Sequence, residues 1–311
     1  MQIIISGSLA YDRIMDFPEY FSDHILPEKI HVLNVCFLVN GVTEKFGGTA
    51  GNIAYALKLL GEDPLITATI GSDYHRYMDR FRDLAIRDEA IKIIKDELSA
   101  GAYITTDKAD NQITGFNPGA MKFSSEYDFA SCDPEETLLI VSPGNIDDMI
   151  RYPTQCKQNG IKYIFDPGQQ LPVFQKQQLL DSISGCYLLI VNDYELELIL
   201  NKTEYSKEDI LSLTGATIVT RGEHGSQLYT NGEVIEIPPF KADQVIDPTG
   251  CGDAYRGGLL YGLKNGKSLQ QSSLLGSLCA SFAVEQYGTQ EYFFTKEAFT
   301  NRLEKGPQII S

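Results

Sequence analysis

The chain has 311 residues, of which 43% are apolar, so it can bury a large core in one or two domains. Its formal net charge of −16 argues against nucleic acid and anionic membranes as partners. We find no signal peptide and no long apolar run, and the cysteines have no CxxC spacing. We therefore expect a cytoplasmic protein with reduced thiols.

Short apolar runs alternate with helical patterns from the N-terminus onward. Continuous apolar runs are typical of strands that are buried on both faces of a parallel sheet. The Asn231-Gly232 turn predicts an antiparallel hairpin over 226–237. This alternation predicts an α/β protein with a three-layer α/β/α core and a mainly parallel sheet. We expect strands at 2–6, 64–70, 138–142, 161–165, 187–191 and 216–220, and helices at 51–60, 194–200, 251–265 and 270–286.

Two stretches interrupt the alternation. Residues 12–46 include the run Phe37–Val42, and residues 101–121 include two short β-rich runs around Ile104 and Ile113. We interpret these runs as short antiparallel strands joined by polar turns.

The segment Asp247–Gly258 carries the clearest chemical signal. Its glycine-rich turn opens directly into an apolar helix, with Asp253 in the first turn. Glycines let backbone N–H groups approach a phosphate, and the helix N-terminus adds partial positive charge. A carboxylate beside those groups can take a proton from an alcohol during phosphoryl transfer. The segment therefore indicates a kinase of a small hydroxyl compound, although a capped helix with an acidic first turn would look similar.

This segment resembles the C-terminal signature of the ribokinase-like (pfkB) family of carbohydrate and nucleoside kinases. Other matches follow in the family's order, and together they span most of the chain. Within the family, segments such as Phe116–Met121 and Asp166–Leu171 are most similar to bacterial adenosine kinase. The remaining family motifs are Gly47–Ala54, Asn192–Glu195 and Thr220–Gly225.

The resemblance implies a ribokinase-like core covered by a small β-lid. In this interpretation the core comprises 1–11, 47–100 and 122–311, and the lid is the discontinuous insertion 12–46 with 101–121. Exposed lid strands in the family can pair between subunits, so a homodimer through the lid is one expectation. Apolar lid residues that face the chain's own core are the alternative.

The resemblance also assigns the transfer chemistry. Asp253 would be the general base, and the N–H groups of Gly250, Cys251 and Gly252 would form an anion hole. Many relatives have Ala at the position of Cys251, which leaves a catalytic thiol as a rival interpretation. ATP would be the donor and Mg²⁺ its metal, with Glu195 acting through water, although Asn192 and Glu195 could simply cap a helix. The other nucleotide-side residues implied are Asn192, Thr220, Arg221, Gly222 and Gly225, with Asp247 beside a monovalent cation such as K⁺.

On the acceptor side, the resemblance implies a sugar site and a slot for a base. Phe116 would stack on the base, because a purine needs a flat apolar slot with polar groups at its edge. The sugar-side residues implied are Ser8, Asp12, Gly48 and Asn52, and the base-side residues are Cys36, Phe116, Gln169 and Gln170.

We therefore expect ATP-dependent phosphorylation of the 5′-hydroxyl of adenosine, which yields AMP. One alternative is a kinase of another nucleoside or of a ribose- or fructose-like sugar. The other is a ligand sensor that keeps the pocket and has lost catalysis.

Overall fold

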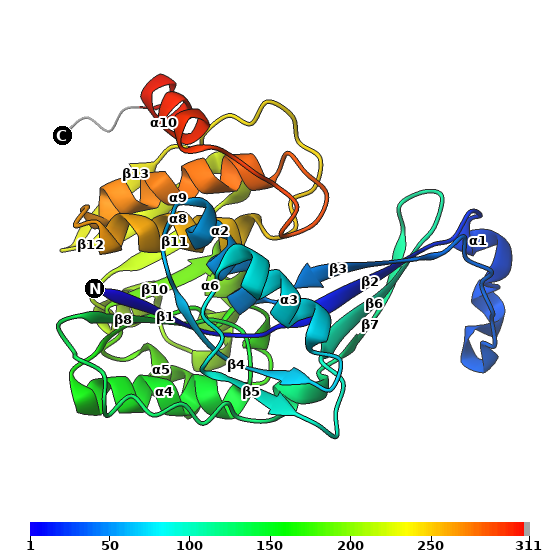
Figure 1. The fold of residues 1–311 in the computed structure, drawn as a ribbon, viewed down its shortest axis with the longest axis horizontal. Coiled ribbons are helices and arrows are strands. Elements are labelled where there is room, and N and C mark those ends of the chain that lie inside the picture. The colour runs from blue at the N-terminus through cyan, green and yellow to red at the C-terminus, as the bar shows by residue number, and fades with distance from the viewer. Residues whose placement is uncertain (308–311) are drawn as a thin grey trace.

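The computed structural model describes residues 1–307, and its centre is a large twisted sheet (Figure 1). The strands are β1 (Gln2–Ser6), β4 (Leu65–Gly71), β5 (Ile91–Ile94), β8 (Thr137–Val141), β9 (Lys162–Phe165), β10 (Leu188–Asn192), β11 (Thr217–Thr220), β12 (Ser226–Thr230) and β13 (Glu233–Ile237). They are ordered β13-β12-β11-β10-β9-β8-β1-β4-β5. Neighbouring strands run parallel from β11 to β5, and β12 and β13 add an antiparallel hairpin.

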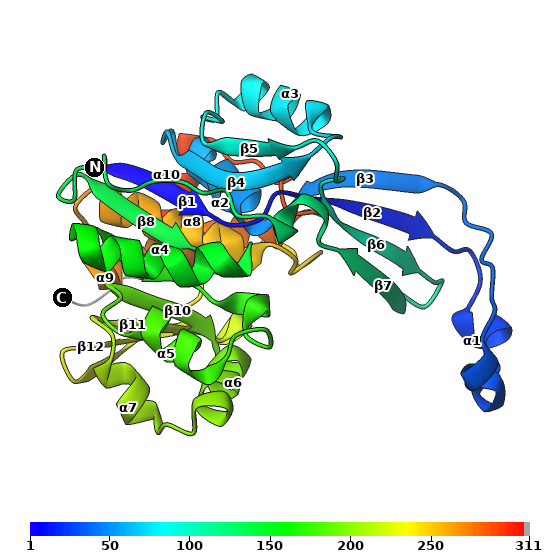
Figure 2. The same ribbon diagram turned by 90° about the horizontal axis from the view of Figure 1, so that it is seen from below.

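Helices cover both faces of this sheet, as Figures 1 and 2 show. One set is α2 (Thr49–Leu59), α3 (His75–Leu84), α8 (Cys251–Lys264), α9 (Leu269–Ala283) and α10 (Lys296–Lys305), and the other is α4 (Ile146–Asn159), α5 (Lys176–Ile183), α6 (Asp193–Thr203) and α7 (Lys207–Ser212). Successive strand residues point to opposite faces. Ile5 therefore packs in the cluster that contains Leu259 of α8, and Ile4 in the cluster that contains Met149 of α4.

A four-stranded lid sheet projects from the core beyond β1 (Figure 2). Its strands are β2 (Ala10–Asp16), β3 (Val42–Gly47), β6 (Ala100–Thr106) and β7 (Gln112–Asn117), in the order β3-β2-β6-β7. The two outer pairs are antiparallel, but the central pair β2–β6 is parallel. The expected antiparallel strands therefore occur within each of the two stretches, and the parallel pair β2–β6 joins the stretches into one sheet. Parallel pairing of β2 with β6 is possible because a long crossover, which contains β3, α2, β4, α3 and β5, connects the two strands.

The excursion between β2 and β3 forms an arm at the far end of the lid, with α1 (Phe21–His24) and a 3₁₀ turn at Pro27–Val32 (Figure 1). We expected a strand at Phe37, and that prediction was wrong, because β3 begins only at Val42. The Phe37 ring instead packs against Phe17 and Phe21, with centroid separations of 4.7 and 5.1 Å. Aromatic packing within the arm thus takes the place of strand pairing.

The predicted α/β fold with a mainly parallel sheet and a small β-lid is confirmed. The six predicted core strands, the hairpin and the four predicted helices all occur near their expected positions. No helix among residues 1–307 is long and apolar enough to cross a membrane.

Candidate active site

The candidate site lies where α8 begins, next to the turn between β1 and β2 and the base of the lid. Gly250 adopts φ 79°, a left-handed conformation that suits glycine, and the helix starts at Cys251. This geometry puts Asp253 in the first helical turn, as the sequence predicts. Ligands in open α/β sheets gather at the carboxyl ends of the strands, and Asn192 and Thr220 end β10 and β11 there.

Asp253 is held by a side chain from a distant helix. Asn52 of α2, which is almost fully buried, donates a hydrogen bond of 2.8 Å from Nδ2 to Oδ2 of Asp253. Withdrawal from water raises the pKa of Asp253 to about 6, and Asp166 and Asp12 act in the same direction, while Arg256 and Asn52 oppose the rise. A carboxylate with a pKa near neutrality is suited to general-base work.

Arg256 lies one turn after Asp253 and forms a buried ion pair with Asp166, which follows β9. The guanidinium donates from Nε to Oδ2 and from a terminal nitrogen to Oδ1, in a two-pronged arrangement. It also donates to the Gly252 carbonyl oxygen at 2.9 Å. Sequence reasoning missed this pair, although an arginine inside an apolar helix is a signal that it needs a buried acid.

Of the residues expected at the sugar, Asn52 contacts Asp253 and Asp12 acts on its pKa, whereas Ser8 and Gly48 lie at the start of α2. Asp12 is in β2, and its pKa is raised by burial and by the nearby Asp247. A Cβ on Gly47 would lie 2.6 Å from the Asp12 carboxylate, so the strand partner gives that side chain its space. Ser8 is committed to the fold, because its hydroxyl accepts a hydrogen bond of 3.1 Å from the Thr49 N–H at the start of α2.

Gly48 lies between the lid and α2 at φ 90°. A Cβ at this position would lie 2.6 Å from the Ser8 carbonyl oxygen and 2.7 Å from the Ala10 nitrogen. Glycine is therefore required here by close backbone packing at the junction of lid and core. The expected role at the sugar is an additional one that these contacts do not test.

The glycine turn before α8 uses one of its N–H groups internally. The Cys251 N–H donates to the Pro248 carbonyl oxygen at 3.2 Å. In this conformation it is therefore not available for the anion hole, in which we had expected it to take part. The first N–H groups of a helix have no partner four residues back, and Gly252 is exposed at this end. Burial and two nearby carboxylates raise the pKa of the Cys251 thiol to about 12, which disfavours a catalytic thiolate.

Asp247 fixes the loop that faces this turn. Its two carboxylate oxygens accept hydrogen bonds from the N–H groups of Thr249, at 2.9 Å, and Gly288, at 3.0 Å. These hydrogen bonds lower the pKa of Asp247 against the effect of its partial burial. Because each carboxylate oxygen already accepts a hydrogen bond, fewer lone pairs of Asp247 are left to bind the monovalent cation that we expected beside it.

Asn192 and Glu195 form a reciprocal capping box at the start of α6. Asn192 Oδ1 accepts from the Glu195 N–H at 2.7 Å, and Glu195 Oε2 accepts from the Asn192 N–H at 2.8 Å. No group of three His, Cys, Asp or Glu residues within 1–307 could hold a metal. A carboxylate that contacts Mg²⁺ only through water fits this arrangement, because Mg²⁺ keeps several waters and is held mainly by substrate phosphates.

The remaining nucleotide-side residues follow β11. Gly222 has φ 56° and open space in front of its α-carbon, whereas a Cβ on Gly225 would collide with the Ile237 carbonyl oxygen at 2.2 Å. Thr220 ends β11 beside β10. The Arg221 guanidinium pairs with Glu236 of β13 and donates to the His224 carbonyl oxygen. Arg221 is therefore engaged by its own hairpin, and its place on the nucleotide side stays a prediction.

The residues expected at the base are spread over two parts of the molecule. Phe116 of β7 is 51% exposed on the lid, and Gln169 is exposed in the turn after β9. Gln170 donates to the Gly144 carbonyl oxygen at 3.1 Å. Cys36 is exposed next to Phe37, whose ring packs in the arm at the far end of the lid (Figure 1). The structure thus does not bring Cys36 together with Asp253 within one chain.

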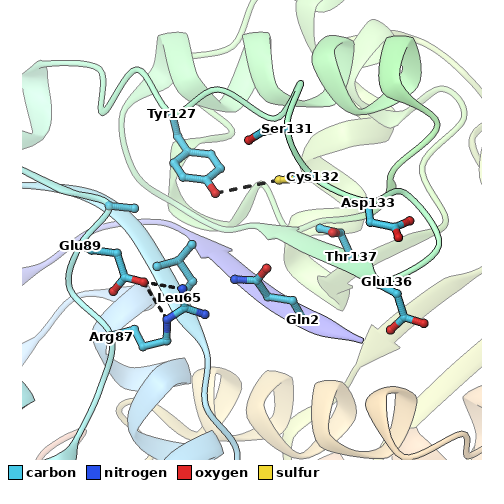
Figure 3. A pocket seen from close by; sticks show the side chains of 11 residues that line it. Gln2, Leu65, Arg87, Glu89, Tyr127, Ser131, Cys132, Asp133, Glu136 and Thr137 are labelled. Carbon is cyan, nitrogen blue, oxygen red and sulfur yellow. Dashed lines mark hydrogen bonds and ion pairs between the residues drawn. The ribbon is translucent and has the colours of Figure 1, made fainter.

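A cavity of about 480 Å³ lies at the amino ends of the strands, on the side of the sheet away from the candidate site (Figure 3). Gln2 of β1 and Thr137 of β8 line it from the amino ends of their strands. Arg87 in this cavity is already paired with Glu89. Because the predicted site residues lie at the carboxyl ends, this cavity is separate from the candidate active site.

The mainly parallel core, the lid and an acidic residue at a glycine-turn helix N-terminus define a small-molecule kinase of the ribokinase-like fold. The chain matches the pfkB family carbohydrate kinases over residues 16–296, and it belongs to that family.

Two relatives are similar over nearly the whole chain. A nucleoside kinase of Methanocaldococcus jannaschii is 34% identical over 283 residues, which are 89% of this chain and 92% of the relative. The structure of a Burkholderia thailandensis nucleoside kinase in complex with inosine is 41% identical, with a TM-score of 0.86 and coverage of 98% and 97%. The Burkholderia enzyme is also known in complex with ADP and inosine, at a TM-score of 0.84. These relatives favour the nucleoside alternative over a preference for adenosine.

Proposed function

We propose that this protein transfers the γ-phosphoryl group of ATP to the 5′-hydroxyl of a nucleoside. The observation that carries the proposal is Asp253, which lies in the first turn of α8, has a raised pKa and is hydrogen-bonded to Asn52 beside Asp12. Similarity to two nucleoside kinases, one of them in complex with inosine, supports the class of acceptor.

In the proposed reaction, Asp253 accepts the proton of the acceptor hydroxyl as the alcohol oxygen bonds to the γ-phosphorus and ADP leaves. The N-terminus of α8 and the N–H groups of Gly250 and Gly252 stabilise the negative charge on the transferring group. Asp12 and Asn52 hold the sugar hydroxyls and so aim the acceptor oxygen. Bound Mg²⁺ would neutralise the triphosphate, with Glu195 orienting water in its hydration shell.

For the nucleobase of the acceptor, we propose a broader class than the adenine that we first expected. A relative in complex with inosine supports a purine nucleoside acceptor without favouring adenosine. Phe116 on the lid would cover the base, and Gln169 would meet its edge. A role for K⁺ near Asp247 and a homodimer through the lid stay predictions.

A panel of acceptors tests the substrate class. We would measure ADP release with Mg·ATP and inosine, adenosine, cytidine, ribose or fructose, and identify the phosphorylated product. We expect a nucleoside to give the highest kcat/KM and a 5′-monophosphate product. A sugar as the best acceptor would overturn the nucleoside assignment, and nucleoside binding without turnover would favour the sensor.

A substitution of the proposed general base, Asp253, tests the mechanism. Asp253→Asn keeps the size of the side chain but removes its basicity, and loss of a general base lowers kcat about 10²–10⁴-fold. Asp147→Asn is a matched control, because Asp147 is an exposed carboxylate in the first turn of α4. Near-normal kcat in Asp253→Asn would disprove the assigned base.

A further inference from the structure

A chain of buried hydrogen bonds runs from the base of the lid to Asp253. The Tyr77 hydroxyl donates to the Gly47 carbonyl oxygen at 2.7 Å. Gln290 Nε2 lies 2.9 Å from that hydroxyl oxygen and 3.1 Å from Asn52 Oδ1. Asn52 Nδ2 then donates to Asp253. Gly47 ends lid strand β3, so the chain connects the lid to the site.

The polarity of this chain is fixed by its two ends. A backbone carbonyl can only accept, so the Tyr77 hydroxyl must donate to Gly47, and its oxygen is left to accept from Gln290. The Gln290 amide must therefore turn its NH₂ group toward Tyr77, and the same group donates to Asn52 Oδ1. That contact leaves the NH₂ group of Asn52 for Asp253.

The burial of the chain makes this polarity costly to reverse. Tyr77, Gln290 and Asn52 are all at least 95% buried, so water cannot easily replace a lost partner. Gln290 Oε1 is buried without a hydrogen-bond partner within residues 1–307, which shows that the amide is engaged through its donor side alone. Burial raises the pKa of Tyr77 far above its usual value, so its hydroxyl stays a donor at every working pH.

We propose that Gln290 and Tyr77 are positioning residues that keep the Asn52 amide turned with its N–H toward Asp253, which holds the base in its proton-accepting form. If the Gln290 amide flipped, its oxygen would face the Tyr77 oxygen and would draw the NH₂ group of Asn52 away from Asp253. The Asn52 carbonyl would then face the carboxylate and would favour its protonated form. The inference rests on the proposed role of Asp253 as base.

Other charged and titratable groups also act on Asp253 and must stay unchanged in the test. Arg256 and Cys251 face it from its own helix, Asp166 from the loop after β9, Asp12 from the lid and Tyr292 from the segment before α10. Neither Tyr77 nor Gln290 carries charge. Their substitution by uncharged residues therefore tests orientation separately from Coulomb effects.

The test measures the acid limb of the kcat/KM profile with inosine and Mg·ATP. Tyr77→Phe keeps the ring packing and removes the hydroxyl, and Gln290→Met removes the amide at similar length. We expect either change to move the acid limb upward by about 0.5–1 pH unit, the shift that one net hydrogen bond produces. Tyr163→Phe is the control, since that buried hydroxyl donates to the Ser182 carbonyl oxygen in the other core cluster.

A second readout does not depend on catalysis. In the wild-type, Tyr77→Phe and Tyr163→Phe backgrounds, the free energy of unfolding is compared with and without Asp253→Asn across pH. The difference changes with pH between the unfolded and the native pKa of Asp253, so the upper limit of this pH range reports the native pKa. An upward shift only in Tyr77→Phe supports the inference. An unchanged upper limit together with lower stability would make the role of Tyr77 merely structural. Full activity in Asp253→Asn would instead disprove the role of Asp253 as base, on which the inference rests.

Discussion

Asn52 Nδ2 lies 2.8 Å from Asp253 Oδ2, and this hydrogen bond joins residues 201 positions apart in the chain. It ties helix α2, which follows the lid, to helix α8, which carries the proposed base. The same amide belongs to the hydrogen-bond chain from Gly47. The base is therefore positioned by the part of the core that adjoins the lid.

The pKa of Asp253 predicts a cost in stability that depends on pH. Its folded pKa is raised to about 6 from the ordinary value of 3.8, so the folded state binds more protons than the unfolded state between these values. Stability should fall as pH rises from 4 to 6, by about 3 kcal/mol at most. We expect Asp253→Asn to raise the free energy of unfolding by about 1–3 kcal/mol at pH 8, with the gain disappearing by pH 4.

Urea denaturation at several pH values would measure this effect. The control is Asp147→Asn, which should show no gain that grows with pH, because Asp147 is exposed. A constant difference between wild type and Asp253→Asn from pH 4 to 8 would contradict the raised pKa.

The buried pair of Arg256 and Asp166 should be essential for stability. The two residues are 7% and 1% exposed. Arg256→Met would leave Asp166 buried without its partner, and breaking such a pair costs about 3–5 kcal/mol. In Arg82→Met, the control, an exposed pair with Asp79 is lost, and we expect a change below about 1 kcal/mol. Equal losses in the two variants, measured by urea unfolding, would show that burial of the pair does not matter.

Gly48 should not tolerate a side chain. Gly48→Ala forces alanine into φ 90° and places Cβ against the Ser8 carbonyl oxygen. We expect a loss of about 2–5 kcal/mol from backbone strain and overpacking together. Gly266→Ala isolates the strain, because Gly266 has φ 70° with no atom within 4 Å of an added Cβ. Thermal unfolding should show a clearly smaller loss in the control, and comparable losses would remove the close-packing argument.

The sequence could predict elements and the local site, but not the contacts between distant elements. Buried runs such as Leu188–Val191 identify strands because both faces of the sheet are covered, and the glycine turn identifies the start of α8. The partners of Asp253 depend on which helices become neighbours, which is set by strand order. Phe37 was misjudged because a β-prone residue can equally join an aromatic cluster.

Phe116 should distinguish a nucleoside from its bare sugar. Its ring is exposed on β7, where it is free to stack on a base that enters beneath the lid. Stacking of a base on an aromatic ring contributes about 1–3 kcal/mol, so Phe116→Ala should raise KM for inosine about 10-fold or more and leave any turnover of ribose unchanged. Ile113→Ala is the matched control, because Ile113 is exposed on the opposite face of the same strand. Steady-state kinetics with both acceptors would decide this, and an equal loss for inosine and ribose would mean that Phe116 supports the lid without contacting the base.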